Sequence, residues 1–489
     1  MTFVLLVVFE LARLALRALL MILVFHLSRA AWTSSRKLQG RAPPPLEDWP
    51  TVTVQLPIRN EFYVVERLLE AVSRLDYPRD KLEIQVLDDS SDETRTRVAE
   101  LAERLRAEGH RVQHVTRAEP TGYKAGALNH GLASAEGEFL AMFDADCVPG
   151  RDFLRNVLPW FTEPDVGCVQ VRWSFLNRSQ SVLTRLQAIV LDGLFIVDQP
   201  ARAGARLPLQ FNGTNGVWRR AAIAAAGGFS PDIVAEDADL SFRAYLAGFR
   251  VVHLRDHAVP TEIPEDMAAF RSQQRRWALG SAQILRTLGL RILGARVPAR
   301  AKLMMLMHLG RHAIDPLILL ACLTSPFTTL YSMPFLVDYG TWLNAGLVGM
   351  VLAASFVFYG AALRRSGAPA RELLLVPLVI PLVIGLSLVY TVAFFQGVVS
   401  RSAPFERTPK AGSATRGAAG PRYRAPKDPV AWLELGFALA HAGFAVSAAR
   451  VGIWAYSGFF AIVALSFGWV SIATLTSRGV GALRAAPRD

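Results

Sequence analysis

The chain has 489 residues, 52% of them hydrophobic, and its mean hydropathy of +0.28 exceeds that of an ordinary soluble domain. The formal net charge of +12 indicates membrane topology and contact with anionic lipids, and no nucleic-acid partner is expected. Cys147, Cys168 and Cys322 are too scattered for a zinc site and imply no disulfide framework.

The first apolar segment runs from Met1 to Leu27 and carries Glu10, Arg13 and Arg17. Their spacing places the three charges on one face of a helix. We expect a spanning helix that docks these charges on other helices; the alternative is a helix lying at the membrane interface. A cleaved signal peptide is not expected, because no basic leader precedes the apolar run and no small-residue cleavage site is evident.

The segment from Thr51 to Glu262 is rich in charge and has only short apolar runs, which predicts one soluble α/β domain. "TVTVQLPIRNE", "LEIQVLDD" and Phe139 to Phe143 are typical of strands, and Asp92 to Glu108 has apolar residues at helical spacing. Alternating strands and helices imply a mainly parallel sheet, whose ligands bind beyond the carboxyl ends of the strands.

Two acidic motifs, Asp88-Asp89 and Asp144-Ala145-Asp146, stand at the ends of predicted strands and should converge on one crevice. Asp144 and Asp146 could clamp a divalent ion, Mg²⁺ or Mn²⁺, with a diphosphate in the remaining positions. The alternatives are an ordinary polar strand end for the second motif and capping of the following turn for the first.

Further along, Glu236-Asp237 opens a predicted helix, where acids can simply complement the helix dipole. The segment "FRSQQRRWALGSAQILRTL" is basic and amphipathic, which predicts a helix on the cytoplasmic membrane face. Lipid contact alone is the alternative for this segment, and Arg271 and Arg275 are expected to reach towards lipid headgroups.

After Arg300 we predict five or six membrane spans, since Ser325 to Val337 is interrupted by two prolines and could be bent or re-entrant. Basic residues after the first helix and between 401 and 427 should be cytoplasmic, which places the soluble domain in the cytosol at the inner membrane. The predicted spans are Leu303 to Leu323, Thr341 to Leu363, Leu373 to Val399, Trp432 to Ala449 and Val451 to Leu475.

In this order the motifs resemble the processive part of glycosyltransferase family 2, which contains cellulose, hyaluronan and mannan synthases. The plant-type cellulose-synthase-like mannan and glucan synthases are more similar still, through "LEIQVLDDSSDET", "YKAGALNHGL", "VQVRWSFLN", "FNGTNGVWRR", "AEDADLSFRAYLAGFR" and "FERTPK". The resemblance covers roughly residues 52 to 410.

The resemblance implies an α/β catalytic domain of the glycosyltransferase A type, Rossmann-like with a mainly parallel sheet, attached to a multi-pass α-helical transmembrane bundle. The expected order is an N-terminal transmembrane helix (1–32), a cytosolic glycosyltransferase domain (45–262), amphipathic interface helices (263–300), transmembrane helices (301–400), a cytosolic gating-type loop and linker (401–430), transmembrane helices (431–477) and a tail (478–489).

The resemblance also assigns roles. Asp237 would be the catalytic base, giving single displacement with inversion, and Asp144 with Asp146 would hold the metal. The acceptor would contact Trp277, Phe211, Asn212, Gly213, Thr214 and Glu236. The nucleotide sugar would contact Asp88, Asp89, Lys124, Asp144, Gln273, Arg276, Phe405, Thr408 and Lys410.

Some of these positions have simpler interpretations. Lys124 could be a solvated charge at a helix start. The loop with Phe405 departs from the cellulose-synthase form at Arg407 and Pro409, and proline and basic residues also suit a plain flexible linker. A polar group at the start of the first predicted C-terminal span could line a passage for a polysaccharide or form an interfacial cap: His308, Arg311, His312 and Asp315.

The predicted function is a membrane-embedded inverting β-glycosyltransferase that extends a β-1,4-linked polysaccharide from GDP-mannose or UDP-glucose and translocates it. The first alternative transfers a single sugar to a membrane lipid, because lipid glycosyltransferases share the domain. The second is a non-catalytic export subunit that has kept the fold. The expected partners are the nucleotide sugar donor, a glycan or lipid acceptor, and membrane lipids.

Overall fold

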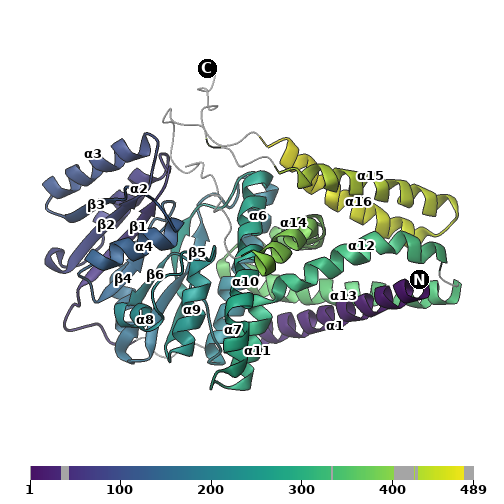
Figure 1. The fold of residues 1–489 in the computed structure, drawn as a ribbon, viewed down its shortest axis with the longest axis horizontal. Helices are drawn as coiled ribbons and strands as arrows, with labels where there is room; N and C mark the ends of the chain where they lie inside the picture. Colours follow the sequence, from purple (N-terminus) through teal and green to yellow (C-terminus); the bar gives the residue numbers. More distant parts are fainter. Residues whose placement is uncertain (1, 35–42, 332–333, 401–422, 424–427, 478–489) are drawn as a thin grey trace, which may run out of the picture.

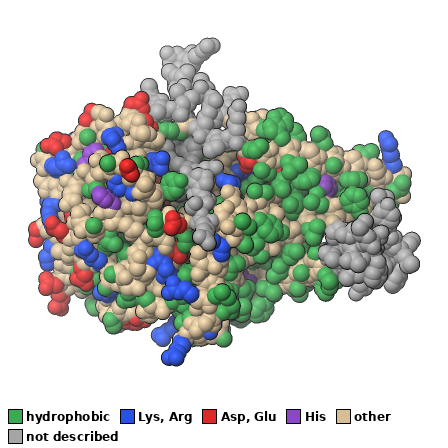
Figure 2. Space-filling model, viewed as in Figure 1, with side chains coloured by type: hydrophobic (Ala, Val, Ile, Leu, Met, Phe, Trp, Pro, Cys, Tyr) green, Lys and Arg blue, Asp and Glu red, His purple; other side chains and the backbone are tan. Residues whose placement is uncertain are grey.

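The computed structural model of the protein describes residues 2–34, 43–331, 334–400, 423 and 428–477. These residues form an α/β domain and a bundle of long helices, which occupy opposite sides of Figure 1. Figure 2 shows charged side chains over the α/β domain and mostly hydrophobic ones over the helices. Long apolar helices with exposed leucines are stable only where lipid replaces water around them.

The α/β domain is built on a seven-stranded mixed sheet in the order β3-β2-β1-β4-β6-β5-β7. Most neighbours are parallel, as predicted, whereas β6 pairs antiparallel with both β4 and β5. The strands are β1 (Val52–Ile58), β2 (Leu82–Asp88), β3 (Arg111–Thr116), β4 (Phe139–Met142), β5 (Val166–Phe175), β6 (Gly216–Arg219) and β7 (Arg250–Thr261).

Helices cover both faces of the sheet. The apolar residues of α3 that are spaced at one helical face, Val98, Leu101 and Leu105, are buried in the larger core together with α2, as the periodicity predicted. A second core packs α4, α8 and α9 around Trp218 of β6. The helices of this domain are α2 (Val65–Ser73), α3 (Thr94–Ala107), α4 (Tyr123–Ser134), α5 (Phe153–Val157), α6 (Val182–Asp192), α7 (Gln199–Gly204), α8 (Arg220–Ala225) and α9 (Glu236–Leu246), with short helical turns at Arg79–Lys81, Leu158–Thr162 and Gly193–Asp198.

Five helical segments of the described residues are long and apolar enough to cross a membrane, or six if a bent pair forms one span. The helices outside the α/β domain are α1 (Thr2–Ser34), α10 (Met267–Gly294), α11 (Ala299–Leu309), α12 (Ile314–Tyr331), α13 (Pro334–Ser366), α14 (Val379–Val399), α15 (Val430–Arg450) and α16 (Trp454–Leu475), with 3₁₀ turns at Arg311–Ala313 and Ala370–Leu378.

The predicted span from Leu303 to Leu323 is not one straight helix. α11 and α12 meet at an angle of 55°, with Gly310 and a 3₁₀ turn between them. Pro316, in the first turn of α12, is tolerated there but would remove a backbone hydrogen bond from the interior of a longer helix. His308 before the break packs against Phe242 of α9 and His312 within it packs against Tyr390 of α14, so the break lies between the α/β domain and the membrane bundle.

The N-terminal helix docks against the bundle through polar side chains. Arg17 donates from Nε to Asn344 Oδ1 of α13 at 3.1 Å. His26 contacts Asp198, which precedes α7, at 2.8 Å. The Arg17 contact agrees with the prediction for that residue, whereas His26 was not among the predicted charges and the side chain of Glu10 lies outside the described residues.

Candidate active site

The site lies at one edge of the sheet because parallel strands end there together. β1 pairs in parallel with both β2 and β4, so the residues that follow these strands meet above the same edge. A cavity of about 190 Å³ opens at this edge. It brings together most of the predicted site residues: Asp89, Lys124, Asp144, Asp146, Asn212, Gly213, Thr214, Glu236, Asp237, Gln273, Arg276 and Trp277.

Two predicted residues lie behind the cavity wall. Asp88 is fully buried, and its carboxylate accepts hydrogen bonds from the Ser90 backbone N–H at 2.9 Å and contacts His114 at 2.9 Å. Burial alone would raise its pKa, but the hydrogen bonds from His114 and Ser90 hold the pKa of Asp88 below its ordinary value. Phe211 is also buried, with its ring edge-on to Trp218. Phe405, Thr408 and Lys410 fall outside the described residues.

Asp144 and Asp146 follow β4 and differ in their surroundings. The Asp144 side chain is 38% exposed and contacts Lys124 Nζ at 2.5 Å. Asp146 is buried, and its Oδ2 accepts from the Thr261 hydroxyl at 2.6 Å and from the Glu262 backbone N–H at 3.1 Å. β7 therefore holds one carboxylate in place while the other faces the cavity.

This pair suits a cation that is also bound by its substrate. Among the described residues, no group of three or more His, Cys, Asp or Glu side chains is placed to hold a metal ion. Mg²⁺ is commonly held by only one or two carboxylates together with water and substrate phosphates. Asp144 and Asp146 thus fit Mg²⁺ or Mn²⁺ bound with a diphosphate, and fit poorly a metal held by the protein alone.

Lys124 stands at the centre of the acidic cluster. Besides Asp144, its Nζ donates to the Gly213 carbonyl at 2.9 Å and lies 3.9 Å from Glu236. Burial alone would lower its pKa, but the carboxylates of Asp144, Glu236 and Asp237 raise it above its ordinary value. Lys124 is a fixed cation in the cavity, which favours the predicted functional role over the alternative of a solvated charge at a helix start.

Asp237 and Glu236 occupy the first turn of α9 and share a buried environment. Burial raises the pKa of Glu236 to about 7 against the opposing charge of Lys124. Burial also raises the pKa of Asp237 above its ordinary value, again opposed by Lys124. A carboxylate with a raised pKa is a stronger proton acceptor when ionised, which is what a general base requires.

The turn at residues 211–215 approaches this base closely. Gly213 has a φ of +80°, and a Cβ at this position would lie 3.0 Å from Asp237 Oδ2. Glycine is needed here both for the backbone conformation and for the space. Thr214 connects this turn to the carboxylates that follow β4, because its Oγ1 accepts from the Asp144 backbone N–H at 2.8 Å.

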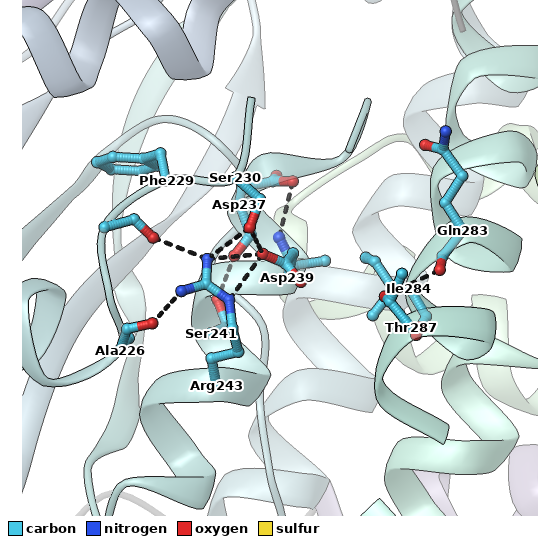
Figure 3. A network of polar contacts seen from close by, with 12 residues as sticks. Ala226, Phe229, Ser230, Asp237, Asp239, Ser241, Arg243, Gln283, Ile284 and Thr287 are labelled. Carbon is cyan, nitrogen blue, oxygen red and sulfur yellow. Dashed lines mark hydrogen bonds and ion pairs between the residues drawn. The ribbon is translucent and has the colours of Figure 1, made fainter. Parts of the chain in front are cut away.

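A polar network centred on Arg243 holds the loop that leads into α9 (Figure 3). Arg243 contacts the buried Asp239 at 2.6 Å and donates to the carbonyls of Ala226 and Gly228, the latter at 2.8 Å. Asp239 also accepts from the Ser230 hydroxyl at 2.6 Å. The network thereby fixes the chain just before the candidate base.

We expect Arg243→Ala to destabilise the α/β domain by about 3 kcal/mol, because it leaves a buried carboxylate uncompensated. Thermal melting of the detergent-solubilised protein measures this as a lowered Tm. Arg250→Ala is the matched control, since Arg250 pairs with the exposed Glu163 and Asp165 and such surface pairs contribute little. Equal Tm values for the two variants would contradict a structural role for this network.

One neighbour of the site was not predicted from the sequence. Arg117 donates to both carboxylate oxygens of Asp89, at 3.0 and 2.5 Å, and to the carbonyls of Thr121 and Tyr123 at 2.7 and 3.2 Å. The available signal was its position directly after β3, whose end comes to the same sheet edge as Asp89. Arg117 links that aspartate to the turn that begins α4 and carries Lys124.

α10 also lines the cavity, through Gln273, Arg276 and Trp277, whose spacing places them on one face of the helix. Trp277 packs beside Trp173 and Phe195. Arg271 and Arg275 of the same helix were predicted to reach towards lipid headgroups, and this prediction is wrong. Arg271 is buried, and Arg275 donates to Gln396 of α14 at 2.8 Å.

The α/β domain has a glycosyltransferase A-type fold, joined here to an apolar helical bundle. Its defining features are the mixed sheet and a single cavity that brings together the carboxylates at the end of β4 and the acidic start of α9. The family model of Glycosyl transferase family group 2 matches residues 139–388, and that of Glycosyl transferase family 2 matches residues 53–209. The chain belongs to glycosyl transferase family group 2, and its resemblance to the cellulose-synthase-like members is confirmed.

Two similar proteins are plant enzymes. Probable glucomannan 4-beta-mannosyltransferase 7 of Oryza sativa subsp. japonica is 37% identical over 279 residues, which are 55% of this chain and 48% of that protein. Glucomannan 4-beta-mannosyltransferase 2 of Arabidopsis thaliana is 39% identical over 251 residues, 50% of this chain and 47% of that protein. The chain thus spans about half the length of the curated relatives it matches.

A solved structure shares the fold. The mannosyltransferase PcManGT from Pyrobaculum calidifontis, solved with GDP-Man and Mn²⁺, superposes with a TM-score of 0.52 at 24% identity. The match covers 71% of this chain and 96% of that one. It supports the glycosyltransferase A-type architecture of this chain.

Proposed function

We propose that the protein is a membrane-embedded inverting β-glycosyltransferase that transfers a sugar from a nucleotide sugar to a growing β-1,4-linked polysaccharide. The observation that carries this proposal is the single cavity in which Asp237, Lys124, the Asp144–Asp146 pair and the α10 face of Gln273, Arg276 and Trp277 meet. A proton acceptor, cations for a leaving diphosphate and a ring that can stack on a sugar are the groups that such a transfer needs.

In this proposal Asp237 takes the proton of the acceptor hydroxyl as the hydroxyl attacks the anomeric carbon, while the nucleoside diphosphate departs. Lys124 and Arg276 neutralise the diphosphate, and Trp277 offers its face to the acceptor sugar. Asp144 and Asp146 would hold Mg²⁺ or Mn²⁺, which supplies further positive charge for the leaving group when bound. One displacement inverts the anomeric centre, so an α-linked donor yields a β-glycoside.

For the donor we propose GDP-mannose, with UDP-glucose as the alternative. The support is the matched plant relatives, which are named as glucomannan 4-beta-mannosyltransferases. In this proposal Asp89 binds the base and ribose of the nucleotide, and Arg117 holds the Asp89 carboxylate in place. Asp88 then acts by shaping the same turn rather than by touching the nucleotide.

The membrane arrangement is part of the same proposal. The catalytic domain faces the cytosol of an inner membrane, with the domain order and boundaries predicted from the sequence. Translocation of the product is supported by the polar residues at the bend between α11 and α12, where His312 contacts Asp315 at 3.0 Å and Arg311 lies beside His308 at 3.3 Å. The predicted gating roles of Phe405, Thr408 and Lys410 stay predictions.

The size of the product tests the proposal. We expect purified protein in lipid vesicles, supplied with Mg²⁺ or Mn²⁺, to convert labelled GDP-mannose into a high-mass glycan and labelled UDP-glucose into much less. Label confined to a small organic-extractable product would replace the polysaccharide synthase by a lipid glycosyltransferase. Absence of transfer from either donor would reject the proposed donors.

A further inference from the structure

α10 carries two polar faces, and only one of them faces the cavity. Gln273, Arg276 and Trp277 line the cavity. The residues that alternate with them, Arg271, Gln274 and Arg275, make side-chain contacts with the membrane bundle instead. The second set lies outside the proposed catalytic site and needs its own explanation.

Arg271 forms the most deeply buried of these contacts. Its side chain is 2% exposed and contacts Glu434 of α15, which is fully buried, as well as Asp428 just before that helix at 2.7 Å. Removing one partner of a buried ion pair is costly, because the remaining charge has no water to replace it. The contact therefore allows α10 little freedom to slide or rotate against α15.

The two other residues hold α10 to α14. Gln274 Oε1 accepts from the Tyr390 hydroxyl at 2.9 Å, and Arg275 donates to Gln396 Oε1 at 2.8 Å. The helices also pack closely one to two turns later, where a Cβ on Gly397 would lie 2.4 Å from the Leu279 carbonyl. We call Arg271, Gln274 and Arg275 with their partners on α14 and α15 the bundle clamp.

The same helix also holds the loop of the candidate base. Gln283, buried in α10, accepts from the Val234 backbone N–H at 3.0 Å, and Figure 3 shows the helix segment with Gln283 beside the α9 region. A Cβ on Gly280 would lie 2.5 Å from the Ala235 Cβ. Ala235 directly precedes Glu236 and Asp237, so a shift of α10 would change how that helix packs against the start of α9.

We propose that Arg271, Gln274 and Arg275 are positioning residues, which fix the register of α10 against α14 and α15 and thereby set the distance between Trp277 and Asp237. This inference rests on the proposed function, in which these two residues act on the same acceptor. Displacements of about 1 Å between reacting groups cost on the order of 100-fold in rate. The bundle is then part of the catalytic framework as well as a membrane anchor.

Two variants test the bundle clamp with little risk to folding. Tyr390→Phe removes one hydroxyl, and Arg271→Met with Glu434→Leu replaces a buried ion pair by apolar side chains, a change that is often neutral for stability. Tyr359→Phe is the matched control, because Tyr359 belongs to α13 and packs on Phe358, away from α10. Arg271→Lys alone keeps a positive charge beside Glu434, and its kcat should lie between those of the parent and the double variant.

We expect the double variant to lower kcat per folded enzyme about tenfold or more, Tyr390→Phe to lower it about threefold, and the control to keep the parental rate. The exchange rate of the backbone amides of residues 272–278 should rise most in the double variant, less in Tyr390→Phe and not in the control. Tm should change little in all three. A purely structural role would lower Tm and leave kcat per folded enzyme unchanged, and this outcome would overturn the inference.

The hydrogen exchange also separates the two proposals. If the parent protein transferred no sugar, the proposed function would fail, and the amides of α10 would still show whether the bundle clamp exists. If the parent were active but the double variant kept both the parental rate and the parental exchange, the bundle clamp would be rejected and the proposed function would stand.

Discussion

Asp237→Asn is expected to lower kcat at least about 1,000-fold, because a general base supplies 10²- to 10⁴-fold in rate and an amide cannot accept the proton of the acceptor hydroxyl. Asparagine has nearly the same shape, so the first turn of α9 and the nearby Gly213 turn should be preserved. Nucleoside diphosphate affinity should remain within a few-fold of the parent. Steady-state turnover and a binding titration on the same preparation measure the two quantities separately.

The pH profile gives this prediction a second readout. Burial raises the pKa of Asp237, and a base must be ionised to act, so kcat should fall with decreasing pH at values above those of an ordinary aspartate. Asp232→Asn is the matched control, since it removes a charge from the exposed part of the same loop. A variant at position 237 with parental turnover would assign the base to another residue.

The sequence predicted the sheet and the acidic side of the cavity well, because both depend on local patterns. Apolar runs that end in Asp88-Asp89 and Asp144-Ala145-Asp146 identify strands and, in a parallel sheet, also identify the edge where their ends meet. The position of β6 is different, because its antiparallel pairing between β4 and β5 depends on contacts far apart in sequence.

Contacts between charged side chains were the least predictable part of the site. Periodicity shows that Arg271 lies on a different helical face from Arg276, but it does not show that the first faces a buried glutamate 163 residues away. Arg117 is a similar case, since its bond to Asp89 requires the end of β3 to lie beside the end of β2. An isolated arginine in a basic chain carries no local signal of such a partner.

The break between α11 and α12 shows the limit of hydropathy in this chain. An apolar stretch of suitable length predicts a span, yet hydropathy does not register backbone geometry. Gly310 and Pro316 on either side of His312 are the local features that could have indicated the bend. The bend places His308 against Phe242 of α9 and His312 against Tyr390 of α14, between the α/β domain and the bundle.

Asp144→Asn should abolish turnover as completely as loss of the base, with kcat reduced about 1,000-fold or more at every Mg²⁺ or Mn²⁺ concentration. Asp144 is the more exposed of the two candidate metal ligands, and it also bonds Lys124. Because Asp144 is partly exposed and Lys124 keeps the Gly213 carbonyl and Glu236 as partners, the replacement should leave Tm close to the parental value while weakening metal binding. Electron paramagnetic resonance of Mn²⁺ with nucleoside diphosphate present measures that binding without any need for transfer.

Asp152→Asn is a suitable control for this variant, because Asp152 follows the same strand but is exposed and bonds Asn156. A chelator should silence the parent protein and the control alike, and added Mg²⁺ or Mn²⁺ should restore both. The variant at position 144 should stay silent after the metal is returned, since the missing ligand belongs to the protein. Full activity of the parent in excess chelator, or equal Mn²⁺ spectra for the parent and the Asp144 variant, would remove the metal from the proposal and leave Lys124 and Arg276 as the cations that face the leaving diphosphate.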